Sequence, residues 1–410
     1  MAASKPNRAD ERRLTNVRAA LGAAYPEPSD AVPQAVEVVR APGCVNLMGD
    51  HTEYNDGLVL PVAVGLDTWL AYRRRRDGLV RLASVAGGSG CSFWIDDVAP
   101  ERPNRAGDSS RDWSKHVEGV AWSLREAGLA ARGLDGVVDS TSPPEAGLGS
   151  ASALELAAAL ALLGGGRGLE RPSLAALAQR AEHDYVGGEG GIMFPYAGAL
   201  GAAGRAIMLD CRSLESRYVT LPYGLSLVVC DAGRRPAGRS ALLAERRSEC
   251  GRAVALIAER VPSIASLRDL DRATLHRYSH LLPDTLTRRA QHVVAENERV
   301  LTTAAALDTA DLEMLGLVFA ASHESLRSLF GVGTPEVDAL VEIALSVRGV
   351  IAARMTDGGS GGWTVNLVLD EAVPALQATV AREYAARTGL DARVYPVDVV
   401  DGAGPLASES

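Results

Sequence analysis

Residues 41–61 read APGCVNLMGDHTEYNDGLVLP, and residues 180–195 read RAEHDYVGGEGGIMFP. The first stretch follows one apolar run, 36–39, and ends within another, 58–64, and the composition of both runs predicts strands. The second follows a segment that is expected to be helical over 173–185, and it contains a glycine run around Glu189. These two stretches carry most of the information about fold and chemistry.

A third stretch, residues 141–150, reads TSPPEAGLGS and leads directly into an Ala- and Leu-rich segment at 151–163. Its prolines and glycines predict a loop, and the following segment predicts a helix. A loop that opens into a helix N-terminus can bind an anion, because unpaired backbone N–H groups and the helix dipole both favour phosphate. Many such loops cap a helix and bind nothing.

Working outward from these stretches, the remaining pattern alternates between blocks of strands and blocks of helices. A polar helix and a linker are expected within residues 1–34, followed by further helices at 116–128, 240–259, 285–306, 311–329, 335–346 and 373–388. Further strands are expected at 69–73, 206–209, 225–229, 351–355, 364–369 and 394–400. This order predicts an α+β protein, and 410 residues suffice for two packed lobes.

The composition is that of an ordinary globular chain, with 47% hydrophobic and 23% charged residues. The net charge is −9, and the basic run at 72–76 is short and lacks interleaved aromatic residues. We therefore expect neither a nucleic-acid partner nor a membrane partner. The five cysteines are scattered without a CxxC pair, and the N-terminus has no apolar signal region, so a reduced, cytoplasmic protein is expected.

Several segments, in order along the chain, resemble those of galactokinases, which are sugar kinases of the GHMP superfamily. Besides the two opening stretches they include WSKHVEGV at 113–120, LDCRSLE at 209–215, RRSEC at 246–250, AQHVVAENERVL at 290–301 and ARMTDGGSGG at 353–362. The resemblance implies a two-lobed GHMP kinase fold with a ligand cleft between the lobes. We predict a polar N-terminal arm at 1–34, an N-terminal lobe with the phosphate loop at 35–205 and a C-terminal lobe at 206–410.

On the nucleotide side, the resemblance implies that the loop formed by Gly147, Leu148, Gly149, Ser150, Ala151 and Ser152 binds ATP. The family holds Mg²⁺ with a serine and a glutamate. Here Ala151 replaces the usual serine, which leaves Ser150 and Glu182 as the expected ligands.

On the acceptor side, the family's Gly-Glu-His-Thr-Asp-Tyr-Asn becomes a run in which the two acids have exchanged lengths, at Asp50 and Glu53. The resemblance implies a substrate-binding set of Asp50, His51, Glu53, Tyr54 and Gly191. Each carboxyl group moves by about one methylene, roughly 1.5 Å, which favours a changed acceptor. A role in lobe packing alone is the alternative interpretation.

The catalytic pair of the family is missing. The family has an Arg where this chain has Cys44, and an Asp where it has Phe194. Phenylalanine accepts no proton, and a thiol does not replace a guanidinium fork. The favoured interpretation of Cys44 is a buried, unreactive thiol. Candidate substitutes for the lost base are Glu189 and Asp357.

Three functions follow from this mixture of kept and lost residues. The first is an ATP-dependent transfer of phosphate to a hydroxyl of a sugar or sugar-like acceptor other than galactose, by a degenerate site. The second is an inactive homologue that binds a small molecule or a protein partner as a regulator. The third is a repurposed enzyme with non-kinase chemistry in the same cleft.

Overall fold

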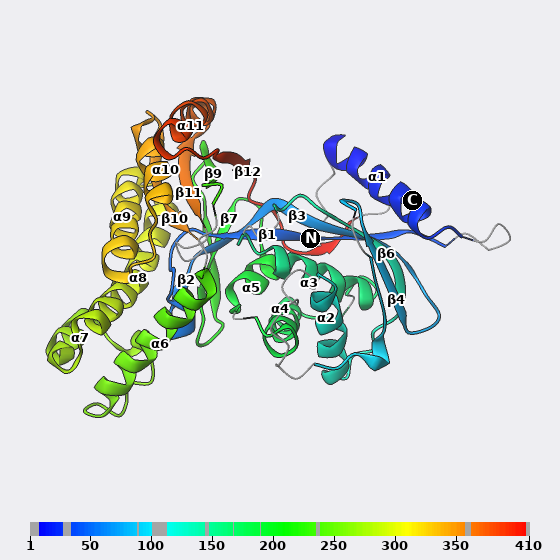
Figure 1. The fold of residues 1–410 in the computed structure, drawn as a ribbon, viewed down its shortest axis with the longest axis horizontal. Coiled ribbons are helices and arrows are strands. Elements are labelled where there is room, and N and C mark those ends of the chain that lie inside the picture. The colour runs from blue at the N-terminus through cyan, green and yellow to red at the C-terminus, as the bar shows by residue number, and fades with distance from the viewer. Residues whose placement is uncertain are drawn as a thin grey trace. The chain divides into compact units, whose positions relative to one another are not determined.

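The computed structural model describes residues 8–27, 34–87, 90–100, 113–143, 147–166, 168–188, 190–234, 238–356 and 362–406 (Figure 1). The chain forms two compact units. Unit 1 contains residues 1–44, 65–201 and 401–410, and unit 2 contains residues 45–64 and 202–400.

Unit 1 is built on a six-stranded sheet in the order β13-β1-β3-β6-β4-β5. Its strands are β1 Glu37–Asn46, β3 Pro61–Arg74, β4 Leu79–Ser84, β5 Cys91–Trp94, β6 Leu134–Ser140 and β13 Gly404–Pro405. Strand β6 pairs antiparallel with β3 and parallel with β4. The sheet is therefore mixed, which agrees with the predicted α+β class.

Helices cover both faces of this sheet. Helix α1 Arg8–Ala24 lies on one face, and α2 Ser114–Glu126, α3 Ser150–Leu162, α4 Arg171–Arg180 and α5 Met193–Leu200 lie on the other (Figure 1). Under α1, the buried side chains Val17 and Leu21 pack with Trp69 and Val137 of the sheet. The predicted polar arm is thus part of the core of unit 1.

Unit 2 contains two smaller sheets and a layer of helices. One sheet has the order β10-β11-β9-β12, and the other has the order β2-β7-β8. The strands are β2 Leu58–Val59, β7 Arg205–Asp210, β8 Ser216–Thr220, β9 Leu225–Asp231, β10 Val350–Thr356, β11 Trp363–Leu369 and β12 Arg393–Val397. The helices are α6 Arg239–Ala258, α7 Arg272–Tyr278, α8 Asp284–Asp308, α9 Leu312–Ser325, α10 Pro335–Ser346 and α11 Val373–Thr388.

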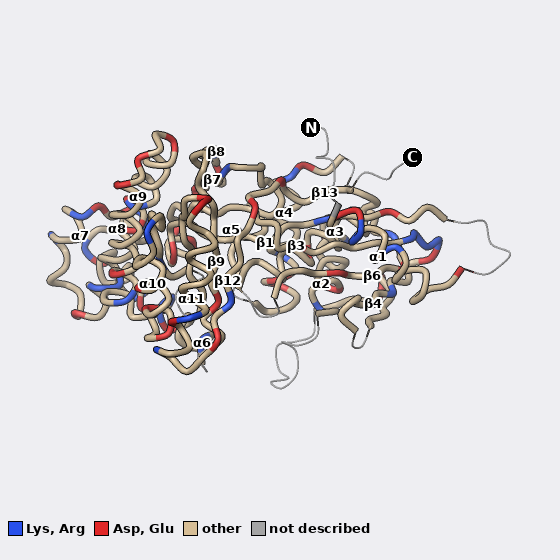
Figure 2. The backbone as a smooth tube through the Cα atoms, turned by 90° about the horizontal axis from the view of Figure 1, so that it is seen from above, with Lys and Arg blue, Asp and Glu red and all other residues tan. Residues whose placement is uncertain are grey.

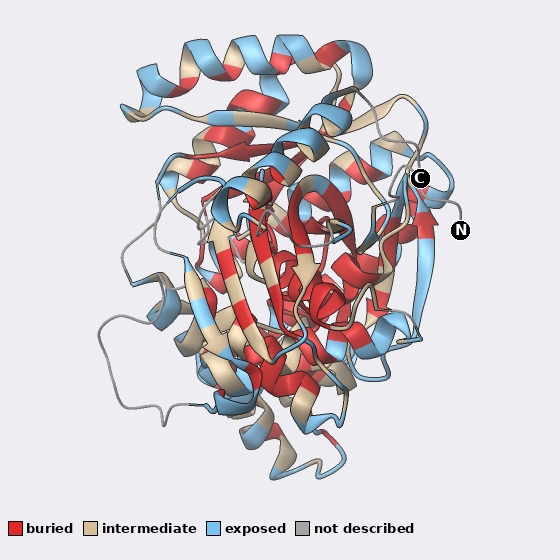
Figure 3. Ribbon diagram, turned by 90° about the vertical axis from the view of Figure 1, so that its right-hand side faces the viewer, coloured by how far each residue is buried: buried red, intermediate tan, exposed pale blue. Residues whose placement is uncertain are grey.

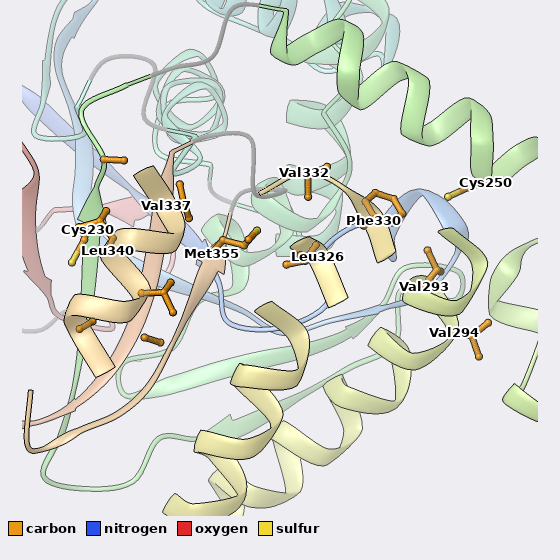
Figure 4. Packing of buried hydrophobic residues seen from close by; sticks show 14 of the residues in the cluster. Cys230, Cys250, Val293, Val294, Leu326, Phe330, Val332, Val337, Leu340 and Met355 are labelled. Atoms are coloured by element: carbon orange, nitrogen blue, oxygen red, sulfur yellow. The ribbon is translucent and has the colours of Figure 1, made fainter. Parts of the chain in front are cut away.

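The core of unit 2 joins its four-stranded sheet to the helices. Cys230 of β9 and Met355 of β10 meet Val337 of α10, and Phe330 extends the same cluster toward Val293 of α8 (Figure 4). Figure 3, in which elements of unit 1 face the viewer, shows buried residues concentrated on the strands and inner helices and exposed residues along the outer helix faces. This is the distribution that amphipathic periodicity predicts.

The division into units differs from the consecutive lobes that we predicted at 35–205 and 206–410. Residues 45–64 belong to unit 2, because β2 pairs with β7 and Leu47 bonds to Leu60. Residues 401–410 belong to unit 1, where β13 pairs with β1. Hydrogen bonding between segments far apart in sequence sets these boundaries.

Most predicted helices are confirmed to within a few residues, but several short elements were not predicted. These are β4, β5, β6, β8, β13, α5 and α7. The predicted strands at 58–64 and 69–73 are also wrong in one respect, since a single long strand, β3, runs through residues 61–74. Helix α5 was not predicted because it contains Pro195, although proline is tolerated in the first turn of a helix.

Charged residues of both signs are interspersed along the described part of the chain (Figure 2). Within that part, no helix combines the length and the apolar character that crossing a membrane requires. No disulfide joins the five cysteines, all of which lie in described segments. The cytoplasmic location remains a prediction.

Candidate active site

The predicted phosphate loop lies in unit 1, at the start of helix α3. Gly149 occupies the N-cap position in a left-handed conformation, with φ of 68° and ψ of 25°, and it supplies no side chain to cap the helix. The first-turn N–H groups of α3 are therefore not satisfied by a capping side chain. That geometry fits a bound phosphate group.

Strand β1 supports this loop directly. The N–H of Cys44 donates to the carbonyl of Leu148 at 2.8 Å. A Cβ atom on Gly43 would lie 2.8 Å from the same carbonyl, and one on Gly149 would lie 3.3 Å from the Cys44 nitrogen. Glycine is needed at 43 because the loop and the strand approach so closely.

Cys44 and Phe194, which the resemblance predicts to stand at the family's Arg and Asp positions, are brought together. The Cys44 thiol donates to the Phe194 carbonyl at 3.4 Å, and a Cβ on Gly149 would lie 3.6 Å from the Cβ of Phe194. Cys44 is fully buried, and burial raises the pKa of its thiol well above the ordinary value. The interpretation of Cys44 as a buried, unreactive thiol is thus supported.

Glu182 lies in a π-helical turn, Ala181–Val186, that follows α4. Its carboxylate rests against the glycine run, since a Cβ on Gly190 would lie 2.4 Å from its Oε2 and one on Gly188 2.9 Å from its Cγ. Burial and the nearby charge of Glu155 raise the pKa of Glu182 to about 7. A cation would favour the ionised form, so Glu182 is suited to be a metal ligand.

Two residues near Glu182 were not predicted. Glu155 of α3 is fully buried, and its Oε1 lies 2.7 Å from Nδ1 of His116 on α2. Burial is the largest single influence and lowers the pKa of His116, but the hydrogen bond to Glu155 together with the charges of Glu155 and Glu182 gives a net rise of that pKa. The sequence signal that could have indicated His116 is its position, within the segment WSKHVEGV, on the apolar side of a predicted helix.

The four acceptor-side residues from 50 to 54 form one turn in unit 2. His51 has a left-handed φ of 66°, and its ring stacks on Phe330 with centroids 4.2 Å apart. Its Nδ1 lies 3.0 Å from the Tyr54 hydroxyl, and the Arg247 guanidinium lies 5.0 Å from the centre of the Tyr54 ring. Glu53 is half-buried in the same turn. The remaining predicted member, Gly191, lies in unit 1 just before α5.

Asp50 is engaged by a residue that we did not predict. Its carboxylate forms a fully buried ion pair with Arg354 of β10, whose Nη1 also donates to the Leu47 carbonyl at 2.7 Å. Only 4% of Asp50 is exposed, which matters because a carboxylate held in this way has limited freedom to bind a ligand. Arg354 stands in the recognised segment ARMTDGGSGG, 304 residues away, and no local pattern links the two.

Helix α8 holds the backbone of this turn, here called the acceptor turn (residues 49–58). The N–H of Gly49 donates to Glu296 Oε1 at 3.2 Å, and the N–H of Leu58 donates to Asn297 Oδ1 at 2.8 Å. His292 Nε2 lies 3.2 Å from the Asp50 carbonyl. Three side chains on one face of α8 therefore fix the turn at both ends.

Glu296 is fully buried yet ionised. Burial alone would raise the pKa of its carboxyl group, but Arg299, His292 and Arg354 outweigh burial and lower that pKa to about 2. Arg299 Nε donates to it at 2.6 Å, and the Ser322 hydroxyl lies 2.8 Å from Oε1. The carboxylate is paired and hydrogen-bonded, as a buried charge must be.

The candidate substitutes for the missing base, Glu189 and Asp357, lie outside the described residues. Asp184 is described, and it is exposed and pairs with Arg180 at 3.5 Å, which places it on the surface. Among the described residues, no group of three or more His, Cys, Asp or Glu side chains is arranged to hold a metal ion. Any metal would thus rely on few protein ligands, such as Glu182 and Ser150.

Comparison with known proteins first defines the class. Residues 115–201 match the family model described as the GHMP kinases N terminal domain. The mevalonate kinase of Methanococcus jannaschii superposes with a TM-score of 0.61 at 16% identity, over 91% of this chain and all of that one. The chain therefore has the two-lobed α+β fold of GHMP kinases, as predicted.

Closer matches define the family. Residues 29–74 match the galactokinase galactose-binding signature. Galactokinase from Chloroflexus aurantiacus is 40% identical over 368 residues, covering 90% of this chain and 92% of that protein. The Lactococcus lactis galactokinase, solved in complex with galactose, superposes with a TM-score of 0.87 at 29% identity, over 96% of this chain and all of that one. The chain belongs to the galactokinase family.

The close packing between the acceptor turn and α8 predicts a stability effect. A Cβ on Gly57 would lie 2.5 Å from Asn297 Oδ1 and 2.8 Å from the Thr52 carbonyl. We expect Gly57→Ala to lower the free energy of unfolding by roughly 1–3 kcal/mol in denaturant titrations. The matched control is Gly251→Ala in α6, where an added Cβ atom meets nothing within 4 Å. This substitution should stabilise the helix by up to about 1 kcal/mol. Equal effects of the two changes would contradict the packing described.

Burial of Cys44 predicts protection from alkylation. At pH 8 iodoacetamide should leave Cys44 unlabelled in the folded protein and modify it once denaturant is added, because the thiolate is the reactive form. Peptide mass spectrometry measures this directly. Labelling of the folded protein at the rate of the denatured chain would mean that the thiol is accessible and reactive.

His292 predicts a pH-dependent stability. Burial lowers the pKa of His292 to about 3, whereas the unfolded chain titrates near 6.5, so the unfolded state binds more protons between these values. The free energy of unfolding should therefore rise with pH across this window, by up to about 1.4 kcal/mol per pH unit from this group. In His292→Gln the slope between pH 4 and 6.5 should be smaller than in the wild type. An unchanged slope would show that His292 does not titrate as described.

Proposed function

We propose that this chain is a phosphotransferase of the sugar-kinase type, which binds ATP and Mg²⁺ and phosphorylates a hydroxyl of a sugar-like acceptor other than galactose. The observation that carries the proposal is the start of α3, where Gly149 is an N-cap that leaves the helix N-terminus open to an anion. Ser150 and Glu182 are the residues that would hold the metal. ATP supplies the phosphoryl group.

A kinase can function with an incomplete site because phosphoryl transfer passes through a loose transition state. Most of the catalysis comes from positioning and charge stabilisation, and loss of a general base typically costs about 10²–10⁴-fold in rate. Loop 147–152 and the acceptor turn both keep well-supported conformations. Slow transfer is therefore compatible with Cys44 and Phe194.

The proposal of an acceptor other than galactose rests on the altered polar groups. The carboxylate of Asp50 is already paired with Arg354. Phe194 is a half-buried apolar residue at a position where the resemblance implies a carboxylate in the family. Leu243, which stands where the family has a tyrosine, is also half-buried. Each change removes or redirects a polar contact, which favours an acceptor with fewer hydroxyl groups to satisfy.

A second candidate function is a ligand-binding homologue without phosphotransfer. The contact between the Cys44 thiol and the Phe194 carbonyl favours it, because neither partner is a proton acceptor for a substrate hydroxyl. Nucleotide binding does not distinguish the two candidates, but turnover does.

The first experiment is a screen of hexoses, pentoses, deoxysugars and polyols, with ADP release as the readout and galactose included. We expect slow turnover on at least one acceptor and little on galactose. If galactose is phosphorylated faster than every other acceptor in the screen, the proposed specificity for an acceptor other than galactose is wrong. Nucleotide binding by calorimetry without ADP release on any acceptor would favour the second candidate.

Restoring the family pair tests the role of the two positions. Cys44→Arg together with Phe194→Asp should raise the turnover of the best acceptor by about 10²-fold or more, since a base and its cation return. The single Cys44→Arg places an unpaired charge at a fully buried site and should cost roughly 3–5 kcal/mol of stability, much of which the double variant recovers. Phe194→Leu is the size-matched control that should not gain activity. A folded double variant that binds nucleotide without any gain would argue against phosphotransfer at this site.

A further inference from the structure

A cavity of about 630 Å³ lies in unit 2 between helices α7, α8 and α9, whose positions are shown in Figure 1. Its volume falls within the range of small-molecule sites, about 300–1,000 Å³. None of the residues assigned above to the nucleotide or the acceptor lines it. Its walls come entirely from the segment 272–329.

The walls combine an apolar surface with cationic groups. Leu275 and Val294 contribute apolar side chains, and Arg272 and Arg299 contribute guanidinium groups. Each guanidinium has five N–H donors, and a neighbouring glutamate accepts from the Nε of each arginine. The one lining carboxylate, Glu324, pairs with Arg327 at 2.7 Å. These features suit a ligand with an apolar body and one anionic group.

Two lining residues also hold the acceptor turn through one intermediate each. The Ser325 hydroxyl lies 2.8 Å from His292 Nδ1, and His292 Nε2 faces the Asp50 carbonyl. This path from the cavity to the turn is only two hydrogen bonds long.

The second path runs through the buried carboxylate. Arg299 Nε donates to Glu296 Oε2, and Glu296 Oε1 accepts from the Gly49 N–H. The two paths are joined, because Arg299 Nη2 also donates to the Ser325 hydroxyl at 3.1 Å. A ligand that binds Arg299 or Ser325 therefore competes directly with Glu296 and His292 for these two side chains.

We propose that this cavity is an effector site for a small amphiphilic anion, and that its occupancy alters the acceptor turn through Ser325–His292 and Arg299–Glu296. The site is separate from the nucleotide and acceptor residues. The proposal does not depend on phosphotransfer. The coupling arises because the hydrogen bonds of Arg299 and Ser325 differ between the occupied and the empty cavity.

The test uses 8-anilinonaphthalene-1-sulfonate, which combines an aromatic body with one anionic group, in calorimetric titrations of the full chain. Ala321→Trp fills the cavity and should weaken binding by about tenfold or more, equivalent to about 1.4 kcal/mol. Its control is Ala320→Trp, on the adjacent exposed residue of α9, which does not line the cavity. Equal affinities of the two tryptophan variants would place the probe elsewhere and overturn the site.

A charge variant tests the anionic group separately. Arg272→Gln should weaken binding several-fold, and Arg277→Gln, an exposed residue of the same helix outside the cavity, should leave the affinity unchanged. Similar losses of affinity in both variants would show that general surface charge causes the effect. They would contradict the proposed preference for an anion.

Hydrogen exchange tests the coupling to the turn. Saturating probe should change the exchange rate of peptides that contain the Gly49 and Leu58 amides, and this change should be absent in Ala321→Trp. Binding in the cavity without any change in these amides would overturn the coupling. Neither readout requires nucleotide or turnover, so both stay informative if the proposed phosphotransfer fails.

Discussion

The buried carboxylate of Glu296 is the constraint on which the acceptor side of unit 2 depends. An isolated charge in a protein interior is costly, and its partners must converge on it from wherever the chain can supply them. Arg299 comes from the same helix, Ser322 from α9, Arg354 from β10 and the Gly49 N–H from the turn. The position of the turn is thus a consequence of neutralising one carboxylate.

The same reasoning applies to Cys44 and Phe194, where the resemblance predicts that a charged pair has been replaced. Removing one member of a buried ion pair leaves the other uncompensated, which typically costs about 3–5 kcal/mol, whereas replacing both with neutral groups is often tolerated. Cys44 and Phe194 are both neutral, and the Cys44 thiol donates to the Phe194 carbonyl. The fold around them is kept because the loop is held by backbone bonds such as Cys44 to Leu148, which do not depend on side-chain identity.

The sequence predicted those features that depend on local pattern or on recognised motifs. Helix α10 was placed at its observed limits, and the start of α3 was placed to within one residue, because periodicity and turn residues are local signals. Strands β4 and β5 were missed because they are short, with six and four residues. The roles of Arg354, Glu155 and Glu296 were missed for a different reason, since a buried charge reveals its purpose only beside a partner from a distant segment.

The interleaving of the two units has a consequence for how the protein is made. The segment 401–406 is secured in unit 1 by the pairing of β13 with β1, by Ala403 donating to Gly198 and by Gly402 donating to Gly201. Unit 1 therefore cannot complete its sheet on the ribosome until residues 404–405 have been synthesised, although most of its residues emerge earlier. Unit 2, in turn, takes residues 45–64 from the first part of the chain. Neither unit corresponds to a continuous stretch of gene, so a chain cut just before residue 401 would keep unit 2 and lack an edge strand of the unit 1 sheet.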